Sequence, residues 1–506
     1  MTLPRRRFLK TTASSVAFIA AAGCDQLPRE LRPLFPPQAK ATGPFQPPSA
    51  DAIDPITHAL NRAAFGPRPG DYERIRKLAA IPQEAAAAYL EEQLAPEKIN
   101  DEFCDYAVRR FETLYEPLGE LFEYQPELLH NELMRATLLR AVMSERQLFE
   151  VMVQFWSDHF NIDPSKGECK WLKVADDRDI IRRHALGKFP ELLRASALSP
   201  AMLWYLDGRV NRKRNTAEKP NENYARELLE LHTLGVHGGY TQNDVMEVAR
   251  CLTGWTVRSK ENKPYFSIGK IEFKPELHDF GSKQILGQTL AGADPKRTKG
   301  QLEQTASSDL DRILQIVTTH PSTALHLGTK LCRHFIADDP PAQAVAAVAA
   351  TFSRTAGDIR ETLRTLFATS DFQQQRGNKL KRPFTFIASA LRGVAAQTDA
   401  GLPMIHYLNR MGHAPFSYPT PDGYPDTAAP WLGTLLWRWN FAVALSENQI
   451  KGTKTDTRSL REKAGGDAAL MAHLLGRKST GEEMKAYHDS EAGIALILAS
   501  PAFQMC

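Results

Sequence analysis

The sequence contains few cysteines, and none of them lie close together. Six of the 506 residues are cysteine, and the five after residue 24 are Cys104, Cys169, Cys251, Cys332 and Cys506. They are odd in number, widely spaced and form no C-x-x-C motif, which argues against a disulfide framework, a zinc ribbon and a haem-attachment site. We therefore expect most of them to be small buried side chains.

The motifs of several common enzyme classes are also missing. The chain has no G-x-S-x-G, no H-E-x-x-H and no G-x-G-x-x-G motif. These absences remove standard serine hydrolases, zincins and dinucleotide-binding enzymes from the leading interpretations. The glycines at 238, 239 and 254 are not followed by G-K-[ST], so they predict turns and not a phosphate loop.

Excess charge is confined to the first 23 residues. The whole chain has a formal net charge of +4, from 63 basic and 59 acidic residues. Residues 1–23 contain Arg5, Arg6, Arg7 and Lys10 but no acidic residue. The remainder of the chain therefore has equal numbers of basic and acidic residues. No basic field remains that would favour nucleic acid as a partner.

The N-terminal segment has the pattern of a twin-arginine export signal. Arg5 and Arg6 are followed at the expected spacing by Phe8, Leu9 and Lys10, and then by a short apolar run over 11–22. That run is shorter than the roughly 20 residues needed to span a bilayer, so it predicts a removable signal over 1–23. The alternative is a basic N-terminus without a targeting role. No later hydrophobic run is long enough to cross a membrane.

Cys24 follows Ala-Ala-Gly and is a candidate lipidation site. Lipoprotein boxes usually have Leu three residues before the cysteine, where this chain has Ala21, so simple cleavage in the same region stays an alternative. Acylation would tether the protein to the periplasmic face of the inner membrane. Without it, we expect a soluble periplasmic protein.

The chain divides into three parts. Residues 1–23 form the signal, and residues 24–55 form a tether that contains eight prolines between Pro28 and Pro55. Residues 56–506 show mainly helical periodicity, with two subdomains divided near 290–310 as one arrangement. We predict a mainly α, multi-helix body with a small β-hairpin insertion near 255–290, built from strands at 265–268 and 270–273. Residues 418–430, rich in Pro, Asp and Gly, predict a rigid loop.

The segment 220–235 carries the most distinctive pattern. Asn221 is a suitable N-cap for the helix that follows, and Gly235 is a suitable terminator. Glu222, Arg226 and Glu230 share one helix face at i, i+4 and i+8, and Asn223 and Glu227 lie beside them. The face is either a solvated ladder of ion pairs or the wall of a cleft with carboxylates for acid–base work or a divalent ion.

Several blocks resemble one family, the large bacterial domain-of-unknown-function family numbered 1800. The blocks cover residues 60–66, 155–160, 200–203, 221–235, 239–250, 253–255 and 278–281, in the family's order. The resemblance implies a secreted, mainly helical protein with no established reaction. It also implies a partner, because genes of this family often lie beside those of exported proteins that look like phosphatases and sulfatases. The pattern of the family that these blocks resemble has asparagine where this chain has Asp158.

Two histidine-containing blocks remain candidates for chemistry. His159 follows an apolar helical stripe and is either a cleft-wall residue or a ligand or catalyst. His278 and Asp279 lie in a loop after the expected strands, where the alternative is a simple Asp-Phe-Gly turn. His159, Glu227 and His278 are the candidate ligands for one divalent metal ion. This is the only cofactor that the sequence suggests.

Two functional hypotheses follow from these patterns. The first is a membrane-tethered binding or assembly protein that contacts another exported protein or an envelope polymer through the 221–230 helix. The second is an envelope hydrolase or lyase acting on a glycan or its ester. Its candidate acid–base groups are Glu222, Glu227, Glu230, His159 and Asp279, and its candidate binding groups are Asn221, Asn223, Arg226 and His278. Convergence of His159, Glu227 and His278 would favour the enzyme, whereas a closed, salt-bridged 221–230 face would favour binding.

Overall fold

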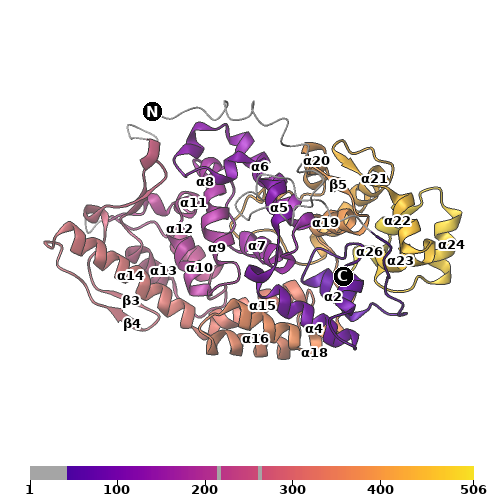
Figure 1. Cartoon of the computed structure of the whole chain (residues 1–506). Helices are drawn as coiled ribbons and strands as arrows, with labels where there is room; N and C mark the ends of the chain where they lie inside the picture. Colours follow the sequence, from indigo (N-terminus) through magenta and orange to yellow (C-terminus); the bar gives the residue numbers. More distant parts are fainter. Residues whose placement is uncertain (1–42, 214–217, 260–264) are drawn as a thin grey trace.

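The chain folds into a mainly α-helical body with three small two-stranded sheets (Figure 1). The computed structural model describes residues 43–213, 218–259 and 265–506. The predicted export signal and Cys24 therefore lie outside the described residues. Among the described residues, no helix is both long enough and apolar enough to cross a membrane.

The first half of the body is a succession of short and medium helices. They are α2 (Pro55–Arg62), α3 (Asp71–Arg76), α4 (Pro82–Gln93), α5 (Glu102–Val108), α6 (Pro126–Met143), α7 (Gln147–His159), α8 (Cys169–Asp176), α9 (Arg182–His184), α10 (Phe189–Ala197), α11 (Pro200–Tyr205), α12 (Asn223–Glu230) and α13 (Gln242–Cys251). Proline occupies the first turn of several of them, where its missing N–H costs nothing.

Helices also make up the second half. They are α14 (Lys299–Thr319), α15 (Pro321–Phe335), α16 (Ala342–Arg354), α17 (Ile359–Ala368), α18 (Ser370–Gln374), α19 (Pro383–Gly393), α20 (Leu402–Arg410), α21 (Leu435–Ser446), α22 (Thr457–Ala464), α23 (Asp467–Leu475), α24 (Gly481–Asp489), α25 (Ile494–Ala499) and α26 (Pro501–Gln504). The predicted loop 418–430 joins α20 to α21, and only its last residues form part of a 3₁₀ turn.

The β insertion lies between α13 and α14, as the sequence predicts, but one of its expected strands is wrong. β1 (Trp255–Val257) pairs antiparallel with β2 (Ile271–Phe273), and β3 (Lys283–Ile285) pairs with β4 (Gln288–Leu290). Residues 265–267 form a 3₁₀ turn instead of a strand, because the partner of β2 is the segment directly after α13. A third pair, β5 (Gln397–Thr398) with β6 (Thr453–Lys454), lies at the other end of the body.

Two local predictions also need correction. The N-cap of α12 is Glu222 and not Asn221, whose Oδ1 instead accepts a hydrogen bond from the Asn223 N–H at 2.9 Å in a turn before the helix. The pattern of residues 178–186 predicts a short helix, and in the structure that helix begins in a π-helical turn, Asp177–Ile181, between α8 and α9. Such turns insert one residue into a helix and are not visible in hydrophobic periodicity.

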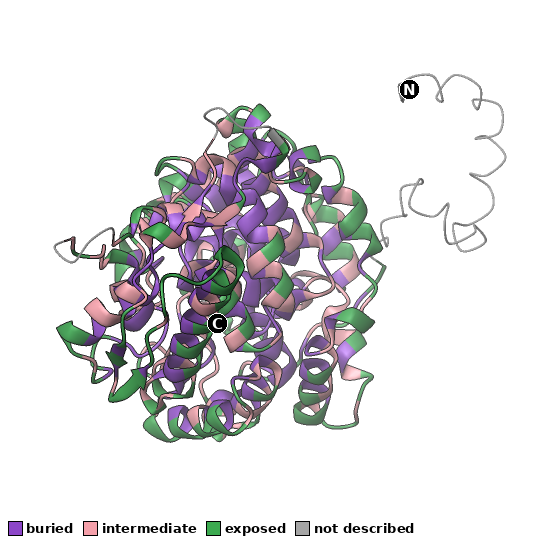
Figure 2. Cartoon of the chain, turned by 90° about the vertical axis from the view of Figure 1, so that its left-hand side faces the viewer, coloured by how far each residue is buried: buried purple, intermediate pink, exposed green. Residues whose placement is uncertain are grey.

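One hydrophobic core runs through the described chain. Its buried side chains come from segments as far apart as Phe45 and Phe503 and from both sides of residues 290–310, and Figure 2 shows buried residues throughout the interior. The predicted stripe of α7 takes part: Met152, Val153 and Trp156 are buried, and Phe160 follows directly. This packing fixes the C-terminal end of α7, where the family-like block 155–160 lies.

Candidate functional site

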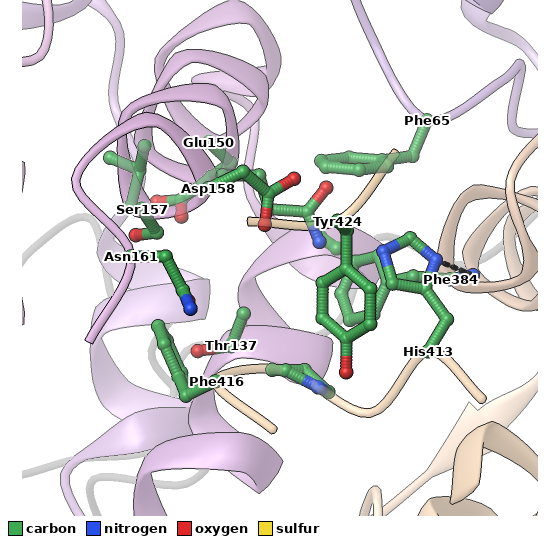
Figure 3. Close-up of a pocket in the computed structure, with 14 residues that line it drawn as sticks. Phe65, Thr137, Glu150, Ser157, Asp158, Asn161, Phe384, His413, Phe416 and Tyr424 are labelled. Atoms are coloured by element: carbon green, nitrogen blue, oxygen red, sulfur yellow. Dashed lines mark hydrogen bonds between the residues drawn. The ribbon is translucent and has the colours of Figure 1, made fainter. Parts of the chain in front are cut away.

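The end of α7 borders a small cavity of about 20 Å³. Ser157 and Asp158 of α7 lie on one side, and His413, Phe416 and Tyr424 lie on the other (Figure 3). The lining mixes apolar side chains with polar and charged ones. Phe65, from the family-like block 60–66, also lines the cavity, so two sequence blocks of the family resemblance meet here.

The polar groups of this cavity are mainly engaged in buried pairs. Asp158 Oδ2 lies 2.8 Å from Nη1 of buried Arg382, and Glu150 Oε2 lies 3.0 Å from Nη1 of Arg182. Burial raises the pKa of Asp158 against the opposing charge of Arg382. Ser157 Oγ is the exception, because it is buried and finds no hydrogen-bond partner in the described part of the chain. The cavity is therefore a small, largely satisfied interior space.

The loop between α20 and α21 closes tightly over the end of α7. Asn161 Nδ2 donates hydrogen bonds to the Tyr418 and Thr420 carbonyls, at 2.9 and 2.8 Å. At Gly423, whose φ is +73°, a Cβ atom would lie 2.0 Å from the Asp158 carbonyl oxygen. Only glycine fits this approach. The loop is thus packed closely against the end of α7.

His159 is buried beside a lysine that the sequence reasoning missed. Lys330 Nζ donates to His159 Nδ1 at 3.0 Å, and His159 Nε2 lies 3.2 Å from the His232 carbonyl oxygen. Burial and the neighbouring Lys330 charge lower the pKa of His159 well below its ordinary value, so the ring is neutral and its Nε2–H donates. Burial also lowers the pKa of half-buried Lys330 to about 8.

Lys330 belongs to a polar stripe along α15. His326, Lys330 and His334 recur at i, i+4 and i+8, and this spacing in the sequence was a signal for a shared helix face. His326 Nε2 lies 3.2 Å from the Leu231 carbonyl oxygen, and His334 Nδ1 lies 2.8 Å from Asp426 Oδ2. The stripe therefore joins α15 to the end of α12 and to the 418–430 loop.

The predicted face on α12 is partly closed. We call Glu222, Arg226, Glu227 and Glu230, together with Gln242 of α13, the α12 face. Arg226 Nη2 lies 3.1 Å from Glu222 Oε2 and 2.8 Å from Gln242 Oε1, and Gln242 Nε2 donates to the same Glu222 oxygen at 2.5 Å. These three side chains form a ring of mutual contacts at the surface.

The other two carboxylates of the α12 face, Glu227 and Glu230, do not belong to this ring of contacts. Glu230 Oε2 accepts a hydrogen bond from the Tyr240 hydroxyl at 3.3 Å. Glu227 is half-buried, and its burial together with the nearby charges of Glu230 and Asp422 raises its pKa. Asp422 is exposed on the 418–430 loop, so the acidic surface extends from α12 to that loop.

Asn221 and Asn223 serve largely to fasten backbone segments. The Asn221 N–H donates to Asn211 Oδ1 at 2.9 Å, and Asn223 Nδ2 donates to the Leu206 carbonyl at 3.2 Å. Asn211 in turn donates to the Ala249 carbonyl at 2.8 Å. The asparagines of the family-like block thus hold the start of α12 against its neighbours.

His278 and Asp279 lie in a separate cluster beside the β insertion. His278 Nδ1 lies 2.7 Å from the Thr253 carbonyl, and its Nε2 lies 3.7 Å from Asp309 Oδ2. Asp279 accepts from Arg250 Nε at 2.6 Å and Lys213 Nζ at 2.7 Å. Although burial alone would raise the pKa of Asp279, these hydrogen bonds lower it well below its usual range.

The structure does not bring the three predicted metal ligands together. The hydrogen bonds of His159 involve Lys330 and the His232 carbonyl, whereas His278 contacts Thr253 and Asp309. In the described ranges, no three His, Cys, Asp or Glu side chains form a group suited to a metal ion. All five cysteines in those ranges are free and buried.

Comparison with known proteins identifies one family. The sequence model described as "Protein of unknown function (DUF1800)" matches residues 58–505. The comparisons found no match among curated proteins and none among solved structures.

Proposed function

Because the chain belongs to the DUF1800 family of proteins of unknown function, we propose its function from the arrangement of its own residues. It is an exported envelope protein, tethered through Cys24 to the periplasmic face of the inner membrane, that binds another exported protein or an envelope polymer through the α12 face. A phosphatase-like or sulfatase-like protein encoded nearby is the first candidate partner.

The closed ring of Glu222, Arg226 and Gln242 is the observation that carries this proposal. Each of the three side chains is held by the other two, so the α12 face is preorganised while it still reaches solvent. Glu227, Glu230 and Asp422 give the surrounding surface a negative charge. A complementary partner presents basic groups or many hydrogen-bond donors.

The surrounding clusters support a scaffold for such a face. Asp158 is paired with Arg382, and Asp279 is paired with Arg250 and Lys213. These buried and half-buried pairs join segments that are distant in sequence, among them α13, which packs against α12. Charged groups that pair with one another inside the protein hold a binding surface in position.

Charge reversal on the α12 face tests the proposal. The double variant Glu227→Lys/Glu230→Lys should bind the neighbouring exported protein, or isolated cell-wall sacculi, at least ten-fold more weakly in a titration at low salt. Raising the salt should weaken binding of the unmodified protein in the same direction. The matched control is Glu84→Lys/Glu482→Lys, which changes the same charge at two other exposed carboxylates. Equal affinities for both double variants would overturn the proposal.

A second candidate function rests on the raised pKa of Glu227. A half-buried carboxyl group that stays protonated to higher pH, close to other carboxylates, is suited to general acid catalysis on a glycan. This is the hydrolase or lyase hypothesis. Its test is release of reducing ends or unsaturated sugars from isolated envelope glycans, abolished by Glu227→Gln and unaffected by Glu84→Gln. Absence of product from the unmodified protein would end this hypothesis.

A further inference from the structure

An exposed apolar face covers the start of α21. It consists of Leu432, Leu435, Leu436 and Trp439, which recur at i, i+3, i+4 and i+7, and we call it the α21 face. All four side chains are exposed, with Leu436 the most accessible at 67%. Leu432 lies in the 3₁₀ turn 429–434 that precedes α21, and Leu435, Leu436 and Trp439 form one stripe on α21 itself.

The segment that carries this stripe has no solvent-facing charge of its own. Between residues 428 and 446 the only charged residue is Arg438, and it is fully buried, with its Nε donating to Thr434 Oγ1 at 3.0 Å. Surface helices normally turn a polar face to water. A helix that is apolar both toward the core and toward solvent indicates a second apolar environment on its outer side.

The neighbouring helix α20 adds groups typical of a membrane interface. The Arg410 guanidinium lies 4.6 Å from the centre of the Trp437 ring, and Tyr407 packs on Phe441 with ring centres 5.5 Å apart. Arg410 and Leu402 are exposed on α20. Tryptophan, tyrosine and arginine at the border of an apolar surface suit the headgroup region of a bilayer, where each has one apolar and one polar part.

The path of the chain places the predicted tether at the same end of the body. Phe45, near the first described residue, donates its N–H to the Lys463 carbonyl at 3.1 Å, and its ring lies 5.0 Å from that of His473. It therefore packs on α22 and α23, which lie with α20 and α21 at the right-hand end in Figure 1. Eighteen residues lie between Cys24 and Gly43, a distance of about 60 Å at the polyproline II spacing of about 3.1 Å per residue.

We propose that the α21 face rests on the phospholipid bilayer in which the Cys24 lipid is inserted. The inference extends the proposed function, since it relies on the membrane tether but not on the α12 face. Leu432, Leu435, Leu436 and Trp439 enter the interface between headgroups and acyl chains, and Arg410 contacts the headgroups. The body then has two contacts with the membrane, a covalent one through Cys24 and an apolar one through the α21 face, which together set the orientation of the α12 face.

Vesicle flotation of the unacylated protein tests this face directly. The chain from Asp25 to Cys506 contains every residue of the described core, and it is mixed with vesicles of phosphatidylethanolamine and phosphatidylglycerol. It should float with the vesicles, and it should still do so in about 0.5 M NaCl because apolar insertion is not screened by salt. Leu435→Gln/Leu436→Gln should reduce the partition coefficient at least ten-fold.

The controls separate this face from general stickiness and from the anchor. Leu128→Gln/Leu325→Gln removes two exposed leucines elsewhere and should leave flotation unchanged. The inference is overturned if the unmodified chain does not float, or if both double variants float equally. It is also overturned if the α21 variant changes only self-association, which would assign the face to a second copy. Loss of lipid labelling in Cys24→Ser separately tests the anchor, so a failed tether and a failed face give different results.

Discussion

At the scale of single residues, Gly423 is where the 418–430 loop depends most on one side chain. Its φ of +73° and the approach of a Cβ atom to 2.0 Å from the Asp158 carbonyl leave no space for alanine. We expect Gly423→Ala to lower the free energy of unfolding by more than about 1 kcal/mol, as shown by the midpoint of urea denaturation.

Gly412 provides the matched control for this substitution. Its φ is +68°, but a Cβ atom there would meet no other atom within 4 Å. Gly412→Ala therefore has only the conformational cost of a left-handed backbone. If the two variants are equally stable, the close contact between the loop and α7 is not formed.

Asp158 pairs with a buried charge at the end of α7. It is the nearest charge partner of buried Arg382, and Asp426 Oδ1 is farther away, at 3.8 Å from Arg382 Nε. Asp158→Ala should cost about 3 kcal/mol of unfolding free energy, because it leaves buried Arg382 with only the more distant carboxylate of Asp426. Asp158→Asn keeps the shape and one hydrogen-bond acceptor and should cost less. Equal stability of both variants and the unmodified protein would show that the pair does not hold the loop.

At the scale of secondary-structure elements, Asp244 connects two of them. Its Oδ2 accepts from the Thr241 N–H at 2.8 Å at the start of α13, and its Oδ1 accepts from the Leu286 N–H at 2.7 Å in the turn between β3 and β4. Asp244→Ala should cost about 1–2 kcal/mol and should speed amide exchange at Leu286.

The cap of α14 separates the loss of a helix cap from the loss of the contact between α13 and the β3–β4 turn. Thr298 and Gln301 form the same reciprocal cap there. Thr298→Ala should therefore destabilise its helix without changing exchange at Leu286. Unchanged Leu286 exchange in Asp244→Ala would show that the contact between the two elements is not formed.

Elements were predictable where local chemistry alone determines them. The segment 189–197 begins after Lys188 with proline in its first turn and an apolar stripe behind it, and α10 has those bounds. The segment 265–268 looked like a strand because of its aromatic and β-branched residues. Strand formation also requires a partner, and β2 pairs with β1, which no local pattern specifies.

The candidate site was less predictable than the helices, because most of its contacts join residues that are far apart in the sequence. The helical face at 222–230 follows from spacing, and so does the register of Arg226 with Glu222. Lys330 reaches His159 across 171 positions, and Arg382 reaches Asp158 across 224. Contacts of this kind depend on the packing of α7, α15 and the 418–430 loop, which the order of residues along one helix does not contain.

At the scale of the whole molecule, the fold buries an unusual set of histidines. Burial lowers the pKa of His58 and His232 to about 3 and that of His473 to about 4. The folded protein therefore keeps these rings neutral at pH values at which the unfolded chain binds protons. Their contribution to stability is complete above pH 6.5 and is lost as the pH falls from 6.5 toward 3.

The expected outcome is a steep loss of stability in mild acid. Each of the three rings accounts for about 2 kcal/mol at pH 5 relative to neutral pH, if the unfolded pKa is the ordinary 6.5. The sum is comparable to the total stability of a typical domain. The midpoint of urea denaturation should therefore fall continuously between pH 7 and pH 5, and a flat profile over this range would contradict the burial of these rings.

Variants of His232 and His473 separate the loss of stability in acid from the contribution of hydrogen bonds made by these rings. Neither ring nitrogen of His232 has a partner within the described residues, whereas His473 Nε2 lies 2.9 Å from the Gly393 carbonyl oxygen. His232→Leu should therefore retain or gain stability at neutral pH, since it removes a buried polar group without a partner. His473→Leu should lose stability at neutral pH because it leaves that carbonyl unpaired. Both variants should lose less stability on acidification than the unmodified protein, because each binds one proton fewer when it unfolds.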